Sequence, residues 1–191
     1  MHGFQDPTSE RGSPCMLPIA RLWNGAPVPD QRKAEVVLTL QADTLHITFT
    51  APYFGDPTPT QEVGSTPRLW EYEVLEVFLV GAAEQYLELE FGPHGHYLAL
   101  CLQGVRTVVS SGHPLQYNVR LEREHYHGQA AVPRDLLPAG PLRGNAFLIH
   151  GPNQACPNTP VGERCYHAHG PVPGPAPDFH RLNHFPLLLL R

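Results

Sequence analysis

An alternation of apolar and polar residues at every second position constrains the fold of this chain more than any other feature. Residues 45–51 read Leu-His-Ile-Thr-Phe-Thr-Ala, which is typical of a strand with one face in a core and the other in water. Residues 35–40 also favour a strand, and the short Gln-Ala-Asp turn between the two segments predicts a hairpin.

A second hairpin is predicted at residues 85–91 and 96–102, because both arms alternate and Gly-Pro-His-Gly joins them. Opposing Phe91 to His96 places six apolar side chains on one face: Leu87, Leu89, Phe91, Leu98, Leu100 and Leu102. The opposite face would carry Tyr86, Glu88, Glu90 and Tyr97. We expect this second face to be solvated or to hold a polar ligand.

Further strands are expected at residues 116–122, 125–132 and 145–150, with one helical turn within 133–137. The chain has 17 glycines and 22 prolines, which suits short strands joined by many turns. This pattern indicates an antiparallel sandwich or barrel. We predict an all-β fold, an antiparallel β-sandwich of jelly-roll type with long Pro/Gly-rich loops at 52–68 and 151–177.

The chain is expected to hold one domain, at residues 21–191, behind a loose N-terminal tail at residues 1–20. A net charge of -5 with a single lysine predicts neither a nucleic-acid nor a membrane partner. The first residues do not resemble a secretory signal. We therefore expect a cytoplasmic protein whose four cysteines are free thiols.

The strongest strand is expected at residues 69–80, in the centre of its sheet. Alternation places six residues on one face: Trp70, Tyr72, Val74, Glu76, Phe78 and Val80. Glu76 would then lie among apolar neighbours, where an unpaired charge is costly. It could bind a ligand or carry a proton. Alternatively, it could form a structural ion pair with Arg106, Arg120 or Arg181, or reach solvent at the edge of the sheet, and we favour these structural roles.

Several motifs in order resemble an uncharacterised protein family named after an open reading frame on chromosome 4. They are Leu-Trp-Glu-Tyr-Glu-Val-Leu-Glu-Val-Phe-Leu (69–79), Gln-Tyr-Leu-Glu-Leu-Glu (85–90), Gly-Pro-His-Gly (92–95), Ile-His-Gly (149–151) and Asp-Phe-His-Arg-Leu (178–182). That family is similar to family-nine carbohydrate-binding modules and to the DOMON superfamily. The resemblance, over residues 22–185, implies a DOMON-like β-sandwich and, by analogy, sugar or haem binding.

A sugar site needs aromatic faces beside polar groups. The candidate ligand-binding residues are Trp70, Glu71, Tyr72, Glu73, Glu88, Glu90 and Tyr97, bordered by the loop at 52–68. In the alternative interpretation, Trp70 belongs to the core and the glutamates are solvated.

A metal site is a weaker hypothesis. The candidate ligands are Cys156, Cys165, His167 and His169, whose residue types suit zinc but whose first spacing is longer than in compact zinc knuckles. Haem ligation by His46, His150 or His180 is a further alternative. We expect no cofactor.

Motifs of known enzyme classes are absent from the sequence, so we expect no catalysis. Glu73 and Glu76 would lie on opposite faces of a strand, whereas Glu88 and Glu90 would share a face that a hydrolase could use. Asp178, His180 and Arg181 could form a polar network with the central strand. The sequence therefore favours a module that binds a carbohydrate or another small polar ligand. The alternative is a protein-interaction module that uses its Pro-rich loops.

Overall fold

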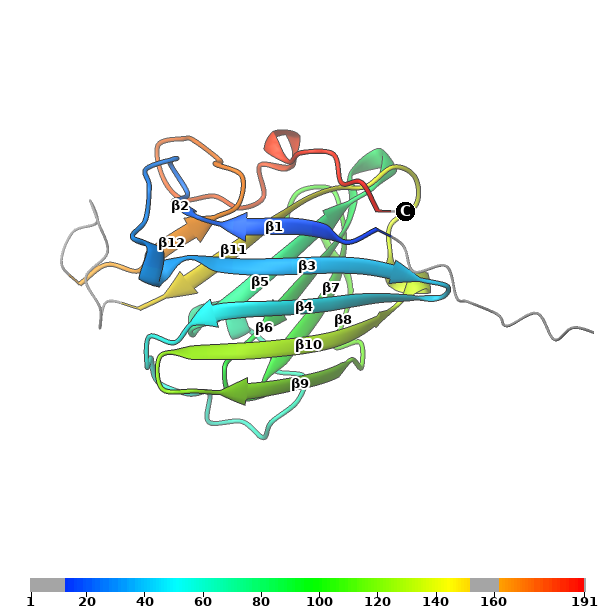
Figure 1. The fold of residues 1–191 in the computed structure, drawn as a ribbon. Coiled ribbons are helices and arrows are strands. Elements are labelled where there is room, and N and C mark those ends of the chain that lie inside the picture. Colours follow the sequence, from blue (N-terminus) through cyan, green and yellow to red (C-terminus); the bar gives the residue numbers. More distant parts are fainter. Residues whose placement is uncertain (1–12, 152–161, 191) are drawn as a thin grey trace, which may run out of the picture.

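The computed structural model describes residues 13–151 and 162–190 as two antiparallel sheets packed face to face (Figure 1). Sheet A has the strand order β1-β3-β4-β10-β9, and sheet B has the order β2-β12-β11-β5-β6-β7-β8. The strands are β1 (Cys15–Ile19), β2 (Arg21–Leu22), β3 (Ala34–Gln41), β4 (Thr44–Pro52), β5 (Val74–Val80), β6 (Gln85–Phe91), β7 (Tyr97–Gln103), β8 (Val108–Ser111), β9 (Gln116–Leu121), β10 (His125–Pro133), β11 (Arg143–His150) and β12 (Cys165–Ala168). The prediction of an all-β sandwich is confirmed.

Helical structure in the described residues is confined to short 3₁₀ turns. These are η1 (Asp30–Arg32), η2 (Leu69–Glu71), η3 (Ala82–Glu84), η4 (Arg134–Leu136) and η5 (Leu182–His184). The turn expected within 133–137 is η4. None of these helices has the length and apolar character needed to cross a membrane.

The main core lies between the two sheets. Sheet A contributes side chains such as Leu38 and Ile47, and sheet B contributes Leu75, Val77 and Leu89, all of them fully buried. Each such side chain stabilises the fold by about 1.5–3 kcal/mol. The alternation seen in the sequence thus identified the inner faces of both sheets correctly.

The predicted hairpins are present, as β3 with β4 and β6 with β7. β5 is central, the fourth of the seven strands of sheet B. The strand nevertheless begins only at Val74, because the chain enters it through η2. Arg68, just before η2, has a left-handed backbone with φ 61°, which breaks the extended chain at that point.

The register predicted for the β6–β7 hairpin was wrong by one residue. Phe91 opposes Tyr97, not His96, because the connection takes one more residue than we expected. A slip of one residue moves every side chain of a strand to the other face. The structure therefore places Leu98, Leu100 and Leu102 beside Glu88 and Glu90, and Tyr97 beside Phe91 in the main core.

The ordered fold also begins earlier than we expected. Cys15–Ile19 forms β1, which pairs with β3 and buries Leu17 and Ile19, so these residues are not part of a loose tail. The sequence analysis likewise missed β12, inside the segment that we took for a loop, where it pairs with β11. Both strands are short, and a four- or five-residue segment carries little periodicity.

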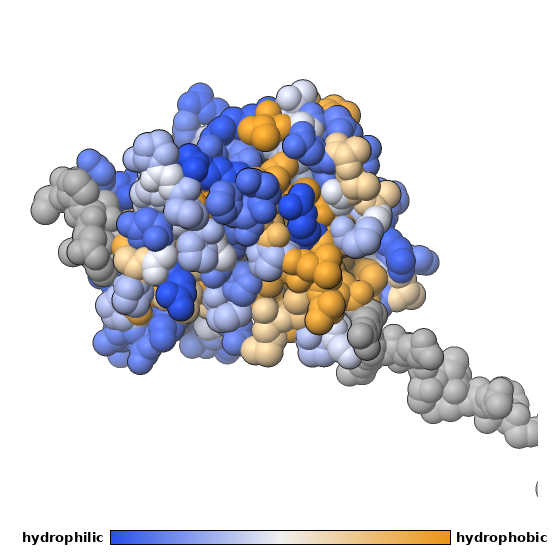
Figure 2. All heavy atoms as spheres, turned by 90° about the horizontal axis from the view of Figure 1, so that it is seen from above, coloured by the Kyte–Doolittle hydropathy of each residue, from blue (hydrophilic) through white to orange (hydrophobic). Residues whose placement is uncertain are grey.

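Sheet B is covered on both faces. A second apolar cluster lies on its outer face and includes Val74, Phe78 and Phe147 from the strands, and Phe179 and Phe185 from the C-terminal segment (residues 177–190). The Pro-rich stretch joins this cover, since the Val172 side chain is buried and its N–H donates to the Trp23 carbonyl. In Figure 2 the molecule is seen from above, where hydrophobic residues gather in one area of a mostly hydrophilic face. The C-terminal segment itself exposes Leu187 and Leu189.

Candidate functional site

The C-terminal segment leaves a cavity of about 420 Å³ open over the outer face of sheet B. The floor consists of side chains from β5, β6, β7 and β11, and the walls come from the residues around η2, β12 and the C-terminal segment. The lining residues are Trp70, Glu76, Phe78, Glu88, Leu100, Leu102, Arg106, Val108, Ile149, Arg164, Tyr166, Pro177, Asp178, Phe179 and His180. A largely apolar hollow of this size with a few convergent polar groups is typical of a small-molecule site.

Three glutamates lie together at the floor of this cavity and below it. Glu76, Glu88 and Glu90 are 2%, 4% and 0% exposed, and a carboxylate oxygen of each lies within 4.8 Å of the others. The strand register explains their proximity, because Glu90 opposes Glu76 across β5 and β6 and Glu88 follows on the same face. The interpretation of Glu88 and Glu90 as part of a solvated face is therefore wrong. Their face is covered by the C-terminal segment.

Burial raises the pKa of all three carboxyl groups. The pKa of Glu88 rises to about 7, with the Arg106 charge acting in the opposite direction. The pKa of Glu76 and that of Glu90 rise well above the usual range, since burial is reinforced by the neighbouring carboxylates. Glu88 Oε2 and both carboxyl oxygens of Glu90 are buried without a hydrogen-bond partner. Such a group favours a proton or a ligand that can donate to it.

The ion pair expected for Glu76 is not found among the described residues. None of the ion pairs in this part of the chain includes Glu76, and the charge that opposes its pKa shift belongs to Arg164. Arg106 and Arg181 instead pair with Asp178, and Arg120 pairs with Glu122.

A hydrogen-bonded network holds one wall of the cavity. The Arg106 N–H donates to the Tyr86 hydroxyl oxygen over 2.9 Å, and that hydroxyl lies 2.8 Å from His180 Nδ1. Asp178 accepts from the Arg106 guanidinium and from the His180 N–H. Burial lowers the pKa of His180 to about 4, so the ring is neutral, and in the tautomer protonated at Nε2 its Nδ1 can accept the Tyr86 proton. The network expected for Asp178, His180 and Arg181 thus joins β6, not the central strand.

Arg164 holds another part of the wall in place. Its guanidinium donates to the carbonyl oxygens of Trp70 and Tyr72, over 2.6 Å each. The Trp70 side chain lines the cavity and stays 40% exposed, whereas Tyr72 packs against the outer apolar cluster of sheet B. The sequence analysis missed Arg164 and Tyr166, because nothing in a local pattern brings β12 beside η2.

The other candidate ligand-binding residues lie elsewhere. Glu73 is buried on the opposite side of sheet B and accepts hydrogen bonds from the backbone N–H groups of Phe54 and Asp56, over 2.8 and 3.2 Å. Glu71 is exposed and pairs with Arg68. Tyr97 packs against the main core, and its hydroxyl accepts from the Leu115 N–H. The loop at 52–68 contributes no lining residue to the cavity.

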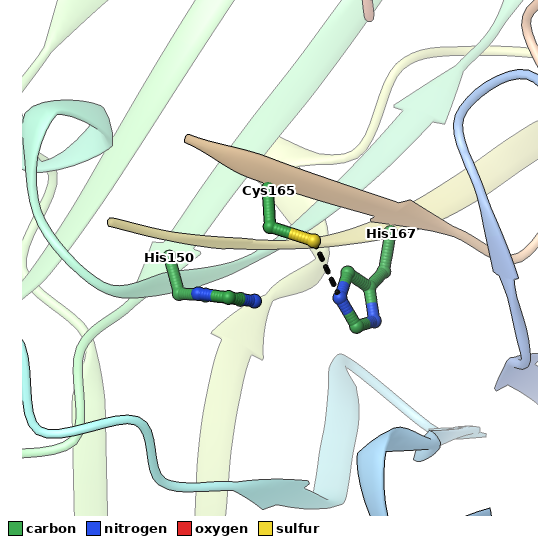
Figure 3. Close-up of side chains that lie close together, drawn as sticks. All are labelled: His150, Cys165 and His167. Carbon is green, nitrogen blue, oxygen red and sulfur yellow. Dashed lines mark hydrogen bonds between the residues drawn. The ribbon is translucent and has the colours of Figure 1, made fainter. Parts of the chain in front are cut away.

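A second group of polar side chains is buried at the end of the main core. His150, at the end of β11, lies next to Cys165 and His167 of β12 (Figure 3). Their ligand atoms all lie within 4.8 Å of one another, and Cys165 Sγ is 3.2 Å from His167 Nε2. Burial lowers the pKa of His150 to about 4 and that of His167 to about 3, so both rings are neutral.

The remaining metal and haem candidates do not join this group. Cys156 lies outside the described residues. His169 uses Nδ1 to contact the Pro18 carbonyl, while the three haem candidates are divided between sheet A (His46), the main core (His150) and the cavity wall (His180). Cys165 is disulfide-bonded, so our expectation of four free thiols was wrong. Cys15 and Cys101 are free.

The fold resembles a solved structure. A crystal structure described as that of a "putative carbohydrate-binding protein" from Bacteroides uniformis superposes with a TM-score of 0.64 over 90% of this chain and 84% of that one. The two sequences are 11% identical, so the similarity concerns the fold alone.

Sequence comparison is more specific. No protein-family model matches the sequence. Curated relatives do match: the UPF0462 protein C4orf33 homologue of Rattus norvegicus is 37% identical over 176 residues, and that of Danio rerio is 35% identical over 176 residues. The human protein C4orf33 is 34% identical over 178 residues, which cover 87% of this chain and 84% of the human one. At this identity and coverage, the chain belongs to the UPF0462 (C4orf33) family.

Proposed function

We propose that the cavity over the outer face of sheet B binds a small polar ligand of the carbohydrate type and does not change it chemically. The observation that carries the proposal is the pair of buried carboxyl groups, Glu76 and Glu88, at the floor of an otherwise largely apolar hollow. Without a ligand, Glu88 keeps one buried oxygen that lacks a hydrogen-bond partner.

A sugar unit matches this arrangement in its chemistry. Its hydroxyl groups can donate hydrogen bonds to buried carboxyl oxygens that have no other donor. Its C–H face can pack on aromatic rings. Trp70 and Tyr166 both line the cavity and offer such rings. A volume of about 420 Å³ lies within the range of small-molecule sites. The fold shared with the Bacteroides uniformis protein also supports this choice of ligand class.

The test is a glycan array followed by calorimetric titration with the free saccharides that bind. We expect Trp70→Ala and Glu88→Gln each to weaken binding by roughly tenfold or more, which corresponds to about 1.4 kcal/mol. Glu71→Gln is the matched control, because Glu71 adjoins Trp70 but pairs with Arg68 outside the cavity. The proposal fails if no saccharide binds the wild type, or if both cavity variants bind like it.

Hydrolysis is the second candidate, and one observation favours it. The oxygens of Glu76 and Glu88 approach within 4.8 Å, close to the separation of about 5–5.5 Å between the carboxyl groups of retaining glycosidases. Such an enzyme needs one ionised carboxylate as the nucleophile, however, and burial raises the pKa of both groups. We therefore expect mass spectrometry to recover a bound oligosaccharide intact, and shortened products would show that the site is catalytic.

A further inference from the structure

The buried group formed by His150, Cys165 and His167 lies apart from the cavity. All three side chains are 0% exposed, and they come from two neighbouring strands of sheet B. Four-coordinate zinc with one sulfur and several nitrogen ligands separates its ligand atoms by roughly 3.3–3.6 Å. The distance of 3.2 Å between Cys165 Sγ and His167 Nε2 is close to this value. The other pairs of ligand atoms lie within 4.8 Å of each other, a separation that side-chain rotation can shorten.

The hydrogen bond of His150 suits metal binding. His150 Nδ1 lies 2.9 Å from the carbonyl oxygen of Gly151 and therefore donates its proton there. Its other nitrogen, Nε2, is buried without a hydrogen-bond partner. A histidine whose second ring nitrogen donates to a backbone carbonyl is the usual arrangement at metal centres, because this bond fixes the ring and leaves the ligating nitrogen unprotonated.

Because Cys165 is disulfide-bonded, its sulfur is not available as the third metal ligand. A thiolate binds zinc, whereas a disulfide sulfur is a poor ligand. The positive charges of Arg32 and Arg164 also act on His150, and that of Arg32 acts on His167. A divalent cation would therefore meet two neutral imidazoles in a positive environment unless Cys165 supplied a negative charge.

We propose that His150, Cys165 and His167 form a zinc site that becomes available only when the Cys165 disulfide is reduced. A dithiol reductant supplies two electrons and two protons to the two protein sulfurs and is itself oxidised to a disulfide. Zn²⁺ then displaces the thiol proton of Cys165 into solvent and is held by Sγ and the two Nε2 atoms. Exchange with a small-molecule disulfide reverses the step: the two protein thiols give two electrons and two protons to that disulfide, the Cys165 disulfide forms again and the metal is released.

Cobalt(II) is the probe, because a bond between thiolate and Co²⁺ gives a near-ultraviolet charge-transfer band. The full chain is reduced with dithiothreitol, desalted without oxygen and titrated with Co²⁺, and the oxidised chain is titrated in parallel. We expect the band in the reduced chain alone, with loss of the band on addition of Zn²⁺. A reduced chain that is folded by circular dichroism but shows no band would overturn the proposal, as would equal binding by the oxidised chain.

Variants identify the ligands. Cys165→Ser should abolish the band, and His150→Gln and His167→Gln should each weaken Co²⁺ binding roughly tenfold or more. His169→Gln and Cys101→Ser are the matched controls, since His169 lies two residues from His167 and Cys101 is a free thiol in β7. A band that persists in Cys165→Ser and disappears in Cys101→Ser would assign the metal to another thiol and refute the site.

Discussion

Glu76 of β5 and Glu90 of β6 oppose each other directly across the centre of sheet B, and both side chains are buried. Like charges in directly opposed positions destabilise a sheet. Burial together with the neighbouring carboxylates raises the pKa of both groups. At least one of the two therefore keeps its proton near neutral pH, and the folded protein binds protons that the unfolded chain releases.

The glutamate cluster should stabilise the protein less as the pH rises above about 4.5. A carboxyl group whose pKa is raised by folding contributes its full stability below its unfolded pKa, and that contribution is lost as the pH rises through the folded value. For Glu88 this window runs from about 4.5 to about 7. We expect the contribution of Glu88 to the free energy of unfolding to fall across this range, while the histidines whose pKa burial lowers contribute in the opposite direction. Glu90→Gln should stabilise the protein at pH 8 by on the order of 1–3 kcal/mol. Urea unfolding of the wild type, Glu88→Gln and Glu90→Gln at pH 5 and pH 8 measures both effects. Glu35→Gln, on the exposed side of β3, should change neither, and a Glu90→Gln variant less stable than wild type at pH 8 would contradict the account.

The partly buried His180 should make stability depend on pH in the opposite direction. Burial lowers the pKa of His180 from 6.5 to about 4, so its contribution to stability is present above pH 6.5 and is lost as the pH falls towards 4. His180→Gln should reduce the loss of stability between these pH values by on the order of 1 kcal/mol, after allowance for its partial exposure. Thermal unfolding at pH 6.5 and pH 4.5 tests this, with the exposed His184→Gln as control. Equal pH dependence in both variants would refute it.

Glu73 should be structural. Its carboxylate accepts the backbone N–H groups of Phe54 and Asp56 and so ties the loop at 52–68 to the start of β5. Glu73→Ala leaves both donors without this acceptor, and we expect a cost of about 2 kcal/mol or more. Hydrogen exchange at these two amides should accelerate, while exchange in β9 stays unchanged. If the saccharide affinity of Glu73→Ala falls as far as that of Trp70→Ala while the loop stays protected, Glu73 belongs to the binding site.

Gly128 leaves the space that the Phe49 ring occupies. It opposes Phe49 across β10 and β4, and a Cβ at Gly128 would lie 2.1 Å from Phe49 Cζ. Gly128→Ala should therefore destabilise the protein by about 1–3 kcal/mol through overpacking. Phe49→Leu removes the clash, so the two substitutions together should cost less than the sum of the two single ones. Chemical denaturation of the double-mutant cycle measures the difference, and strict additivity would argue against the contact. Gln129→Ala, on the exposed neighbour, is the control.

The inner faces of the sandwich were predictable because they follow a local rule. Residues 45–51 alternate, and the side chains that alternation assigned to the interior, including Leu45 and Ile47, are buried. The central place of β5 was equally visible, since a strand apolar on both faces must be covered on both sides.

The site was only partly predictable, because it depends on distant partners. The burial of Glu88 and Glu90 requires the C-terminal segment, which is distant in the sequence: Tyr86 and His180, which are in contact, lie 94 positions apart. The proximity of His150 to Cys165 requires the pairing of β11 with β12, which the sequence analysis missed. The register of the β6–β7 hairpin was predicted wrongly because the sequence Gly-Pro-His-Gly is compatible with a turn of four residues and with a turn of five.

One wall of the cavity is translated after the strands of both sheets. Pro177, Asp178, Phe179 and His180 follow every strand of both sheets. A nascent chain can therefore pair the described strands of both sheets before the cavity exists, and the glutamates stay open to water until translation has passed this segment. A premature stop codon just after β12 would leave a sandwich with an apolar, acidic face uncovered, which is a surface that chaperones and proteases recognise.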